Sequence, residues 1–173
     1  PMASGQPLSA VVGRKELLDA GTGMHFFTTA GNPVACAAAL ATIKIIYEEK
    51  LMDNADKLGK YLLSKLNGLK DKYEMIGDIR GKGLVTGAEL VKDRSAREPA
   101  PELTALILYR SYELGLLFFD SGINSNVLEF TPPLIIDKKQ ADTAVGILDQ
   151  AFADVIGGKV DKKRLEDFAG WCS

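Results

Sequence analysis

The chain has 173 residues, of which 46% are hydrophobic and 25% are charged, so a packed globular core is expected in place of disorder. Its formal net charge of −2 gives no reason to expect nucleic acid or an anionic membrane as a partner. No apolar run approaches the roughly 20 residues of a membrane span, and His25, the one histidine, leaves little material for a zinc site or a Ser-His-Asp triad. Cys36 and Cys172 form no CxxC pair, which favours a reducing cytoplasm over a disulfide framework.

The N-terminal residues resemble part of a larger structure. Residues 8–12 predict a short buried strand that Gly13 ends, and residues 14–19 predict one or two helical turns. An independent domain rarely begins with an apolar strand that has no sequential neighbour to pair with. We therefore expect this N-terminus to be a cut within a longer chain.

A Thr-Thr-Ala-Gly-Asn-Pro run combines a helix start with hydroxyl groups. Asn32 is a preferred N-cap and Pro33 suits the first helical position, so a helix is predicted from Pro33 to about residue 50. The Thr28 and Thr29 hydroxyls and the Gly31 amide would lie beside the positive end of this helix, where free N–H groups point outward. This pattern suits an anion such as phosphate. The alternative is an ordinary capped helix in which the threonines only satisfy the turn.

Further elements follow from apolar spacing and turn residues. The alanine-rich first half of the helix from Pro33 is expected to be buried against a second surface. An amphipathic helix is predicted from about residue 53 to 73, and a later one begins at a capping pair, Asp137 and Gln140. Between them we expect strands at 75–80 and 84–90, a polar loop at 93–101, a helix at 103–114 and strands at 116–119 and 127–130. This order predicts an α/β sandwich with a small, largely antiparallel sheet.

Four segments, in order, carry a family resemblance. The first two segments read ASGQPLSAVV from residue 3 and FTTAGNP from residue 27. The third is IRGKGL from residue 79 followed by GAEL from residue 87, and the fourth is NVL from residue 126 followed by PPL from residue 132. The chain resembles the C-terminal part of class III pyridoxal-phosphate aminotransferases, the family of 4-aminobutyrate and ornithine aminotransferases and some amino-acid racemases. The similarity spans residues 1–158, and the closest branch holds aminotransferase-like enzymes and branched-chain amino-acid epimerases.

The resemblance implies an α/β fold of fold type I, in which a large domain carries the cofactor. Residues 1–31 would be the end of the large domain, 32–158 the small C-terminal α/β domain and 159–173 a polar tail. Pyridoxal 5'-phosphate is the implied cofactor, with Thr28 and Thr29 as cofactor-binding residues. In the family, the threonine that matches Thr28 reaches the cofactor phosphate of the neighbouring subunit, so a homodimer with shared active sites is expected.

The implied reaction is transfer of an amino group from an amino acid, or from an ω-amino acid of the 4-aminobutyrate type, to a 2-oxo acid. The same family also holds racemases and epimerases, which form the alternative. A stand-alone α/β interaction module without catalysis is the alternative that involves no enzyme.

Two positions depart from the family pattern. The Schiff-base lysine of the family falls immediately before Pro1, so the chain holds no catalytic residue and is expected to be inactive by itself. Many members carry an arginine three residues before the Pro-Pro pair, where it binds a substrate carboxylate, but this chain has Glu129 there. Glu129 is thus a candidate substrate-binding residue for a substrate that is held otherwise or presents an amine. The alternative is a solvent-facing strand residue.

Overall fold

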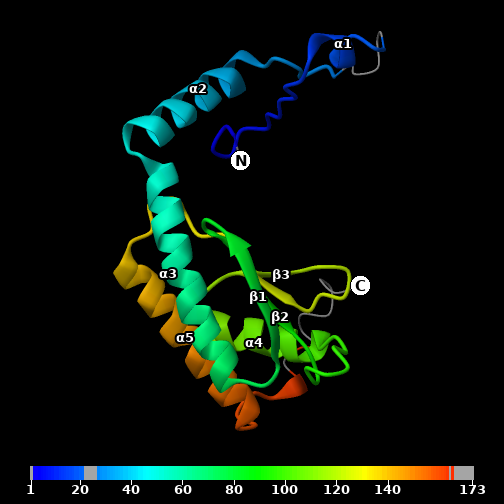
Figure 1. The fold of residues 1–173 in the computed structure, drawn as a ribbon, viewed down its shortest axis with the longest axis vertical. Helices are drawn as coiled ribbons and strands as arrows, with labels where there is room; N and C mark the ends of the chain where they lie inside the picture. The colour runs from blue at the N-terminus through cyan, green and yellow to red at the C-terminus, as the bar shows by residue number, and fades with distance from the viewer. Residues whose placement is uncertain (1, 22–26, 164, 166–173) are drawn as a thin grey trace. The chain divides into compact units, whose positions relative to one another are not determined.

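The computed structural model describes residues 2–21, 27–163 and 165 (Figure 1). Its contacts divide the chain into two compact units, Pro1–Leu51 and Met52–Ser173. The first unit holds α1 (Lys15–Leu18) and α2 (Pro33–Glu48). From the unit boundary onward follow α3 (Leu51–Lys72), β1 (Ile76–Lys82), β2 (Val85–Leu90), α4 (Pro101–Glu113), β3 (Phe119–Ser121), β4 (Val127–Phe130) and α5 (Lys138–Ile156). The predicted domain boundary after residue 31 stays a prediction.

The start of α2 confirms the predicted cap. Asn32 is the N-cap, its side chain accepts a hydrogen bond from the Val34 amide at 2.9 Å, and Pro33 is the first helical residue. The predicted burial of the first half of α2 is wrong for this chain. Only Ala35 and Ala39 of this helix are buried, and Val34 remains 64% exposed. An alanine-rich helix face needs a second packing layer to be buried, and the described part of the first unit supplies none over most of α2.

The segment before α2 differs from its prediction in one respect. Residues 8–12 form no strand, and Val11 and Val12 are 81% and 96% exposed. A strand needs a neighbouring strand for its N–H and C=O groups, and no described residue of this chain pairs with the segment. The predicted helical turn at 14–19 is confirmed as α1.

The second unit is built on a four-stranded sheet of order β1-β2-β4-β3, in which every neighbouring pair is antiparallel. This confirms the predicted antiparallel sheet. The β1–β2 turn lies slightly later than predicted, and Gly83 supplies its positive φ of 56°. β3 also begins later than predicted, because the Leu116 amide donates to the Ser111 carbonyl at 2.8 Å and prolongs the end of α4.

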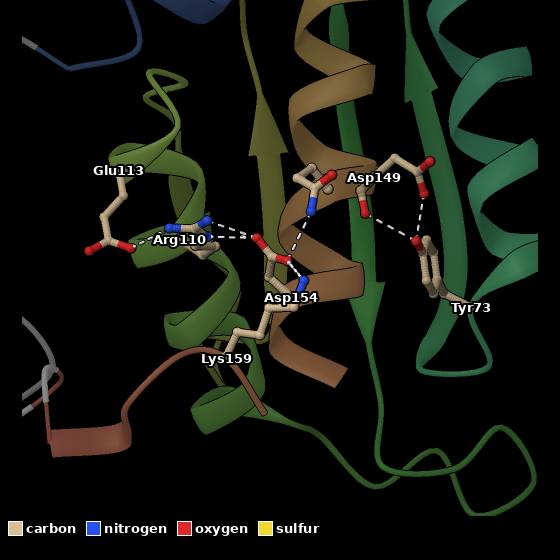
Figure 2. A network of polar contacts seen from close by, with 7 residues as sticks. Tyr73, Arg110, Glu113, Asp149, Asp154 and Lys159 are labelled. Carbon is tan, nitrogen blue, oxygen red and sulfur yellow. Dashed lines mark hydrogen bonds and ion pairs between the residues drawn. The ribbon is translucent and has the colours of Figure 1, made fainter. Parts of the chain in front are cut away.

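One face of the sheet packs against all three helices of this unit. Ala88, Leu90, Leu128 and Phe130 point from β2 and β4 into a core that also contains buried side chains of α3, α4 and α5, among them Leu66, Ile107 and Phe152. Figure 1 shows α3 and α5 alongside each other. Tyr73 directly follows α3, and its hydroxyl donates a hydrogen bond to Asp149 Oδ1 of α5 at 2.6 Å (Figure 2). The opposite face of the sheet is covered by none of these helices.

The predicted capping pair of α5 is also present. The Gln140 amide donates to Asp137 Oδ1 at 2.7 Å, and the Asp137 amide donates to Gln140 Oε1 at 3.0 Å. The two residues form a capping box, which fixes where α5 begins. This start places residues 131–136 as a loop that leads from the end of β4 to α5.

Candidate functional site

The two sets of predicted site residues lie in different units, and each is described by itself. In the first unit, residues 27–31 form a turn before α2. The Ala30 amide donates to the Phe27 carbonyl at 3.0 Å, and the Asn32 amide donates to the Thr29 carbonyl at 3.2 Å. Gly31 has a φ of +67°, which only glycine adopts at little cost. Thr28 and Thr29 are both exposed in this turn.

The amides of the first turn of α2 are already bonded. Val34 and Ala35 donate to Asn32 Oδ1 at 2.9 and 3.4 Å, and the Cys36 amide donates to the Asn32 carbonyl at 2.9 Å. Pro33 has no amide hydrogen to give. The expectation that this helix presents free N–H groups to an anion is therefore wrong, because the Asn32 side chain that caps the helix takes up the same groups.

Other donors remain in the turn itself. The hydroxyls of Thr28 and Thr29, and the amides of Thr28, Thr29 and Gly31, make no hydrogen bond to any other residue in the described ranges. A Cβ placed on Gly31 would meet no atom within 4 Å, so a ligand can approach this backbone. The turn also lies at the positive end of α2, whose 16 residues give it a full helix dipole. These donors fit a phosphate, although exposed threonines in a plain capped turn would look the same.

In the second unit, Glu129 belongs to a row of residues that crosses the whole sheet. Arg80 pairs with Gly87, Gly87 with Glu129, and Glu129 with Phe119. Directly paired residues project their side chains to the same side of a sheet, so this row lies on the face away from the helices. Gly87, between Arg80 and Glu129, has no side chain, and a Cβ there would lie 3.1 Å from Val127 Cγ1.

On this face of the sheet, Arg80 is paired with two carboxylates, whereas Glu129 has no charged partner. Arg80 Nη1 contacts Glu89 Oε2 at 2.6 Å and Asp78 Oδ2 at 2.9 Å, and the hydrogen bond that Arg80 donates to Glu89 is the main cause that raises the pKa of Arg80. The Glu129 side chain makes no hydrogen bond or ion pair with a residue of the described ranges. It is nevertheless partly buried. A carboxylate in this position can accept hydrogen bonds from a ligand without losing a partner in the chain.

Glu129 also contributes to the wall of an open hollow of about 490 Å³, called the Glu129 hollow below. The wall is mostly apolar and includes Phe118, Phe119, Pro132, Pro133 and Ile135, together with Leu62 of α3 and Gln140, Ala141 and Ala144 of α5. Phe119 and Ile135 are 64% and 69% exposed at its edge. Because residues of α3 and α5 line it, the hollow opens on the helix-covered side of the sheet, whereas the pairing register places the Glu129 side chain on the other side.

Phe119 is a lining residue of this hollow that the sequence does not single out. It was predicted as the end of a short strand, whereas it begins β3 and lies directly opposite Glu129. An exposed phenylalanine opposite a glutamate becomes visible only when the pairing register of β3 and β4 is known. No local pattern in residues 116–121 specifies that register.

A larger hollow of about 980 Å³ lies elsewhere in the second unit, between the start of α4 and the β3–β4 turn. Three of its four charged lining side chains are paired: Lys92 forms an ion pair with Glu98, and Glu102 with Lys162 at 2.6 Å, while the Asp120 side chain has no partner in the described ranges. Among its described charged side chains, this hollow therefore presents one unpaired charge, that of Asp120, to a ligand. Within the described ranges, no group of three or more histidine, cysteine or acidic side chains could hold a metal ion. None of the described helices is both long and apolar enough to cross a membrane.

Comparison with known protein families and curated proteins gives consistent results. The model of the family "Aminotransferase class-III" matches residues 1–152. An alanine/serine racemase of Pyrococcus horikoshii is 44% identical over 162 residues, which are 94% of this chain and 34% of the relative. A probable 4-aminobutyrate aminotransferase of Bacillus subtilis is 40% identical over 149 residues, 86% of this chain and 34% of the relative. The chain thus spans about a third of the length of the curated relatives that it matches.

Solved structures share the fold. A phospholyase from Arthrobacter, in complex with phosphoethanolamine, has a TM-score of 0.80 and 39% identity over 88% of this chain and 37% of its own. An amine transaminase from an uncultivated Pseudomonas species, solved in a PLP-bound form, has a TM-score of 0.70 and 36% identity over 76% of this chain and 30% of its own. Both are similar in sequence as well as in fold, which makes a chance likeness of small α/β domains untenable.

Proposed function

Since this chain belongs to the class III aminotransferase family, whose cofactor is pyridoxal 5'-phosphate, we propose that it forms the C-terminal part of an aminotransferase. The enzyme would transfer an amino group from an amino acid, or from an ω-amino acid of the 4-aminobutyrate type, to a 2-oxo acid. The observation that carries this proposal is the family match over residues 1–152, together with 40% identity to a probable 4-aminobutyrate aminotransferase. The fold of the second unit supports it through its solved neighbours.

When bound, pyridoxal phosphate supplies an electron sink for negative charge at the α-carbon of the substrate. The contribution of this chain would be to hold the phosphate. The Thr28 and Thr29 hydroxyls and the Gly31 amide are donors without a partner in the described ranges, and a doubly charged phosphate is a strong acceptor. The lysine that holds the cofactor in this family falls before Pro1, so this chain would position the cofactor and bind substrate without supplying that lysine.

The organisation of the enzyme is part of the proposal. Residues 1–31 would complete the large domain, 32–158 would form the small domain and 159–173 the tail. A homodimer in which Thr28 of one subunit contacts the cofactor of the other would account for the exposed apolar side chains of α2, such as Leu40 at 70% exposed. A cytoplasmic location is proposed from the cysteine pattern alone.

Racemisation or epimerisation of amino acids is a second candidate, because an alanine/serine racemase is 44% identical and an isoleucine 2-epimerase is 39% identical over 98% of this chain. The two reactions share the removal of a proton from the α-carbon and differ in where the proton returns. Return to the opposite face of the same carbon inverts the configuration, whereas aminotransfer requires a 2-oxo acid as acceptor. No observation favours the third possibility, an interaction module without catalysis.

The test uses the full-length protein with pyridoxal phosphate and single enantiomers of amino acids, with and without a 2-oxo acid. An aminotransferase should produce more than one equivalent of a new 2-oxo acid per active site only when the acceptor is present. Inversion of the amino acid without an acceptor would favour the second candidate. Neither product with any of the twenty amino acids or 4-aminobutyrate would refute both.

A further inference from the structure

We propose that residues 166–173, called the C-terminal segment below, close the hollow of about 980 Å³ beside α4, with Phe168 and Trp171 against its apolar wall. The hollow would then be a docking surface inside the protein, and the C-terminal segment its occupant. This inference goes beyond the proposed function, because it concerns how the second unit is completed and holds for any reaction of the enzyme.

The chain turns back toward α4 once α5 has ended. The Lys159 amide donates to the Asp154 carbonyl at 2.9 Å, and Lys159 Nζ donates to Asp154 Oδ1 at 3.0 Å. Three residues later, Lys162 forms an ion pair at 2.6 Å with Glu102 in the first turn of α4. Leu165, a further three residues on, is partly buried and belongs to the wall of the hollow. These contacts lead the chain from the end of α5 across the start of α4 and into the hollow.

The spacing of side chains in this part of the chain favours continued contact with the hollow. Lys162 and Leu165 lie three positions apart in a 3₁₀ turn, which has three residues per turn and places side chains i and i+3 over one another. Phe168 and Trp171 follow at the same interval of three. Continuation of this period would direct both aromatic side chains to the hollow and the acidic residues 166 and 167 away from it.

The wall offers apolar surface that the described residues leave uncovered. Ile123, in the turn between β3 and β4, is fully exposed, and Pro99, Leu103 and Leu108 add apolar atoms from the loop before α4 and from α4 itself. The eight residues after Leu165 span at most about 28 Å when extended, which is long enough to fold back across this hollow. Large aromatic side chains gain most from such burial, because they remove the largest apolar area from water.

The charges around the hollow would direct the C-terminal segment without holding it. Lys162 and Glu102 are 72% and 62% exposed, and an ion pair between exposed groups contributes little free energy. The affinity would therefore come from burial of the two aromatic side chains. The unpaired Asp120 carboxylate in the hollow would repel the acidic residues 166 and 167, which agrees with their placement on the side away from the hollow.

The test follows the fluorescence of Trp171, the one tryptophan in these 173 residues, in the full-length holoenzyme. Each variant is measured with and without Trp171→Phe, and the difference isolates the emission of Trp171. A docked Trp171 should emit at shorter wavelength than free tryptophan and be quenched several-fold less by acrylamide. Ile123→Asp adds a charge to the wall at a fully exposed position, so it spares the core. It should return both signals of Trp171 toward those of free tryptophan.

Two further variants control for the position of the charge. Leu117→Asp is the matched control, because Leu117 is 72% exposed but lines the Glu129 hollow, and it should leave the emission of Trp171 unchanged. Glu102→Lys should raise acrylamide quenching less than Ile123→Asp does, since it breaks only an exposed ion pair. Adding Lys162→Glu to Glu102→Lys restores opposite charges and should reverse this increase.

Three results would overturn the inference. Emission and quenching of Trp171 like those of free tryptophan would mean that the C-terminal segment is not docked. A buried signal that responds to Leu117→Asp, or that does not respond to Ile123→Asp, would place the segment on another surface. A buried signal that is lost on dilution would mean that the segment occupies the hollow of a second copy of the chain.

Discussion

Arg110 of α4 and Asp154 of α5 form an ion pair in which two nitrogens of one guanidinium donate to a single carboxylate oxygen. Nε and Nη2 lie 3.0 and 2.8 Å from Asp154 Oδ2 (Figure 2). The other carboxylate oxygen accepts from Lys159 Nζ at 3.0 Å and from Gln150 Nε2 at 2.9 Å. The Asp154 side chain is only 2% exposed, so both oxygens are satisfied inside the protein. This carboxylate holds together α4, α5 and the segment that follows α5.

The Asp154 network predicts a stability that depends on pH. Hydrogen bonds from Lys159 and then Arg110 lower the pKa of Asp154 to about 2, compared with about 3.9 for an unfolded aspartate. Below pH 3.9 the unfolded chain binds a proton that the folded chain does not, so the stabilisation is complete above this pH and is lost as the pH falls toward 2. Asp154→Asn should therefore reduce the free energy of unfolding strongly at pH 7 and much less at pH 2 to 3.

Urea unfolding of wild type and Asp154→Asn between pH 2 and pH 7 measures this difference. Glu113→Gln is the matched control, because Glu113 also contacts Arg110, at 2.9 Å, but is more exposed. Its effect should be small throughout. If the difference in free energy of unfolding between wild type and Asp154→Asn stays constant down to pH 2, the network does not lower the pKa of the Asp154 carboxyl.

Tyr73 provides a second link between α3 and α5. Its hydroxyl donates to Asp149 Oδ1 at 2.6 Å, and its ring stacks on Phe152 with centroids 4.9 Å apart. Burial is the main cause that raises the pKa of Tyr73, so the hydroxyl stays protonated and acts as a donor. Tyr73→Phe keeps the ring contact and removes the hydrogen bond, which should cost roughly 1–2 kcal/mol in urea unfolding. Tyr112→Phe, at a residue 60% exposed, should change stability by less than about 0.5 kcal/mol. Equal changes in the free energy of unfolding for Tyr73→Phe and Tyr112→Phe would contradict a structural role for the Tyr73 hydroxyl.

Gly59 lets α3 lie against the β1–β2 turn. A Cβ at this position would lie 2.0 Å from the Gly83 carbonyl oxygen, which belongs to the backbone and cannot rotate away. Gly59→Ala should therefore force α3 and the turn apart and cost roughly 1–3 kcal/mol. Gly68→Ala in the same helix is the control, because a Cβ there meets no atom within 4 Å. It should stabilise by about 0.5–1 kcal/mol, since alanine favours a helix over glycine. Thermal unfolding of both variants tests the opposite signs, and two changes of the same sign would reject the close packing of α3 on the turn.

The features that the sequence predicted correctly depend on neighbours in the chain. The Asn32 cap and the Asp137–Gln140 capping box each involve residues within three or four positions, so their chemistry is visible as a local pattern. The antiparallel sheet also followed, because β1 and β2 are joined by a glycine turn. The family resemblance came from four ordered motifs, and it identified Thr28 and Glu129 as positions of interest.

The features that the sequence did not predict depend on distant partners. The row that joins Arg80, Gly87, Glu129 and Phe119 exists only because four strands share one register, and a shift of one residue would turn each side chain to the other face. The predicted burial of residues 8–12 and of the first half of α2 was wrong for the same reason. Both segments are apolar, but the described part of their unit holds no layer that covers them. Composition indicates which side chains favour burial, whereas the packing partner decides whether they are buried.

Thr28 and Thr29 give a prediction that separates phosphate binding from a plain helix cap. In the class III resemblance, Thr28 matches the threonine that contacts the cofactor phosphate, while Thr29 accepts the Asn32 amide through its carbonyl at 3.2 Å, a bond that its side chain does not affect. A hydrogen bond to a charged group is worth about 1.5–3 kcal/mol. In the full-length protein, Thr28→Ala should therefore weaken binding of pyridoxal phosphate by roughly ten-fold or more, and Thr29→Ala by much less.

The measurement is the dissociation constant of pyridoxal phosphate for each variant, with the oligomer mass determined in parallel. Thr28→Ser is the control, because serine keeps the hydroxyl and removes only a methyl group, so cofactor affinity should stay close to that of wild type. Thr28→Ala should retain the wild-type oligomer mass, since the turn is held by backbone bonds from Ala30 and Asn32 that the substitution leaves in place. Cofactor affinity that is unchanged in both alanine variants would mean that the two threonines only flank the cap of α2, and the phosphate site would then have to be sought elsewhere.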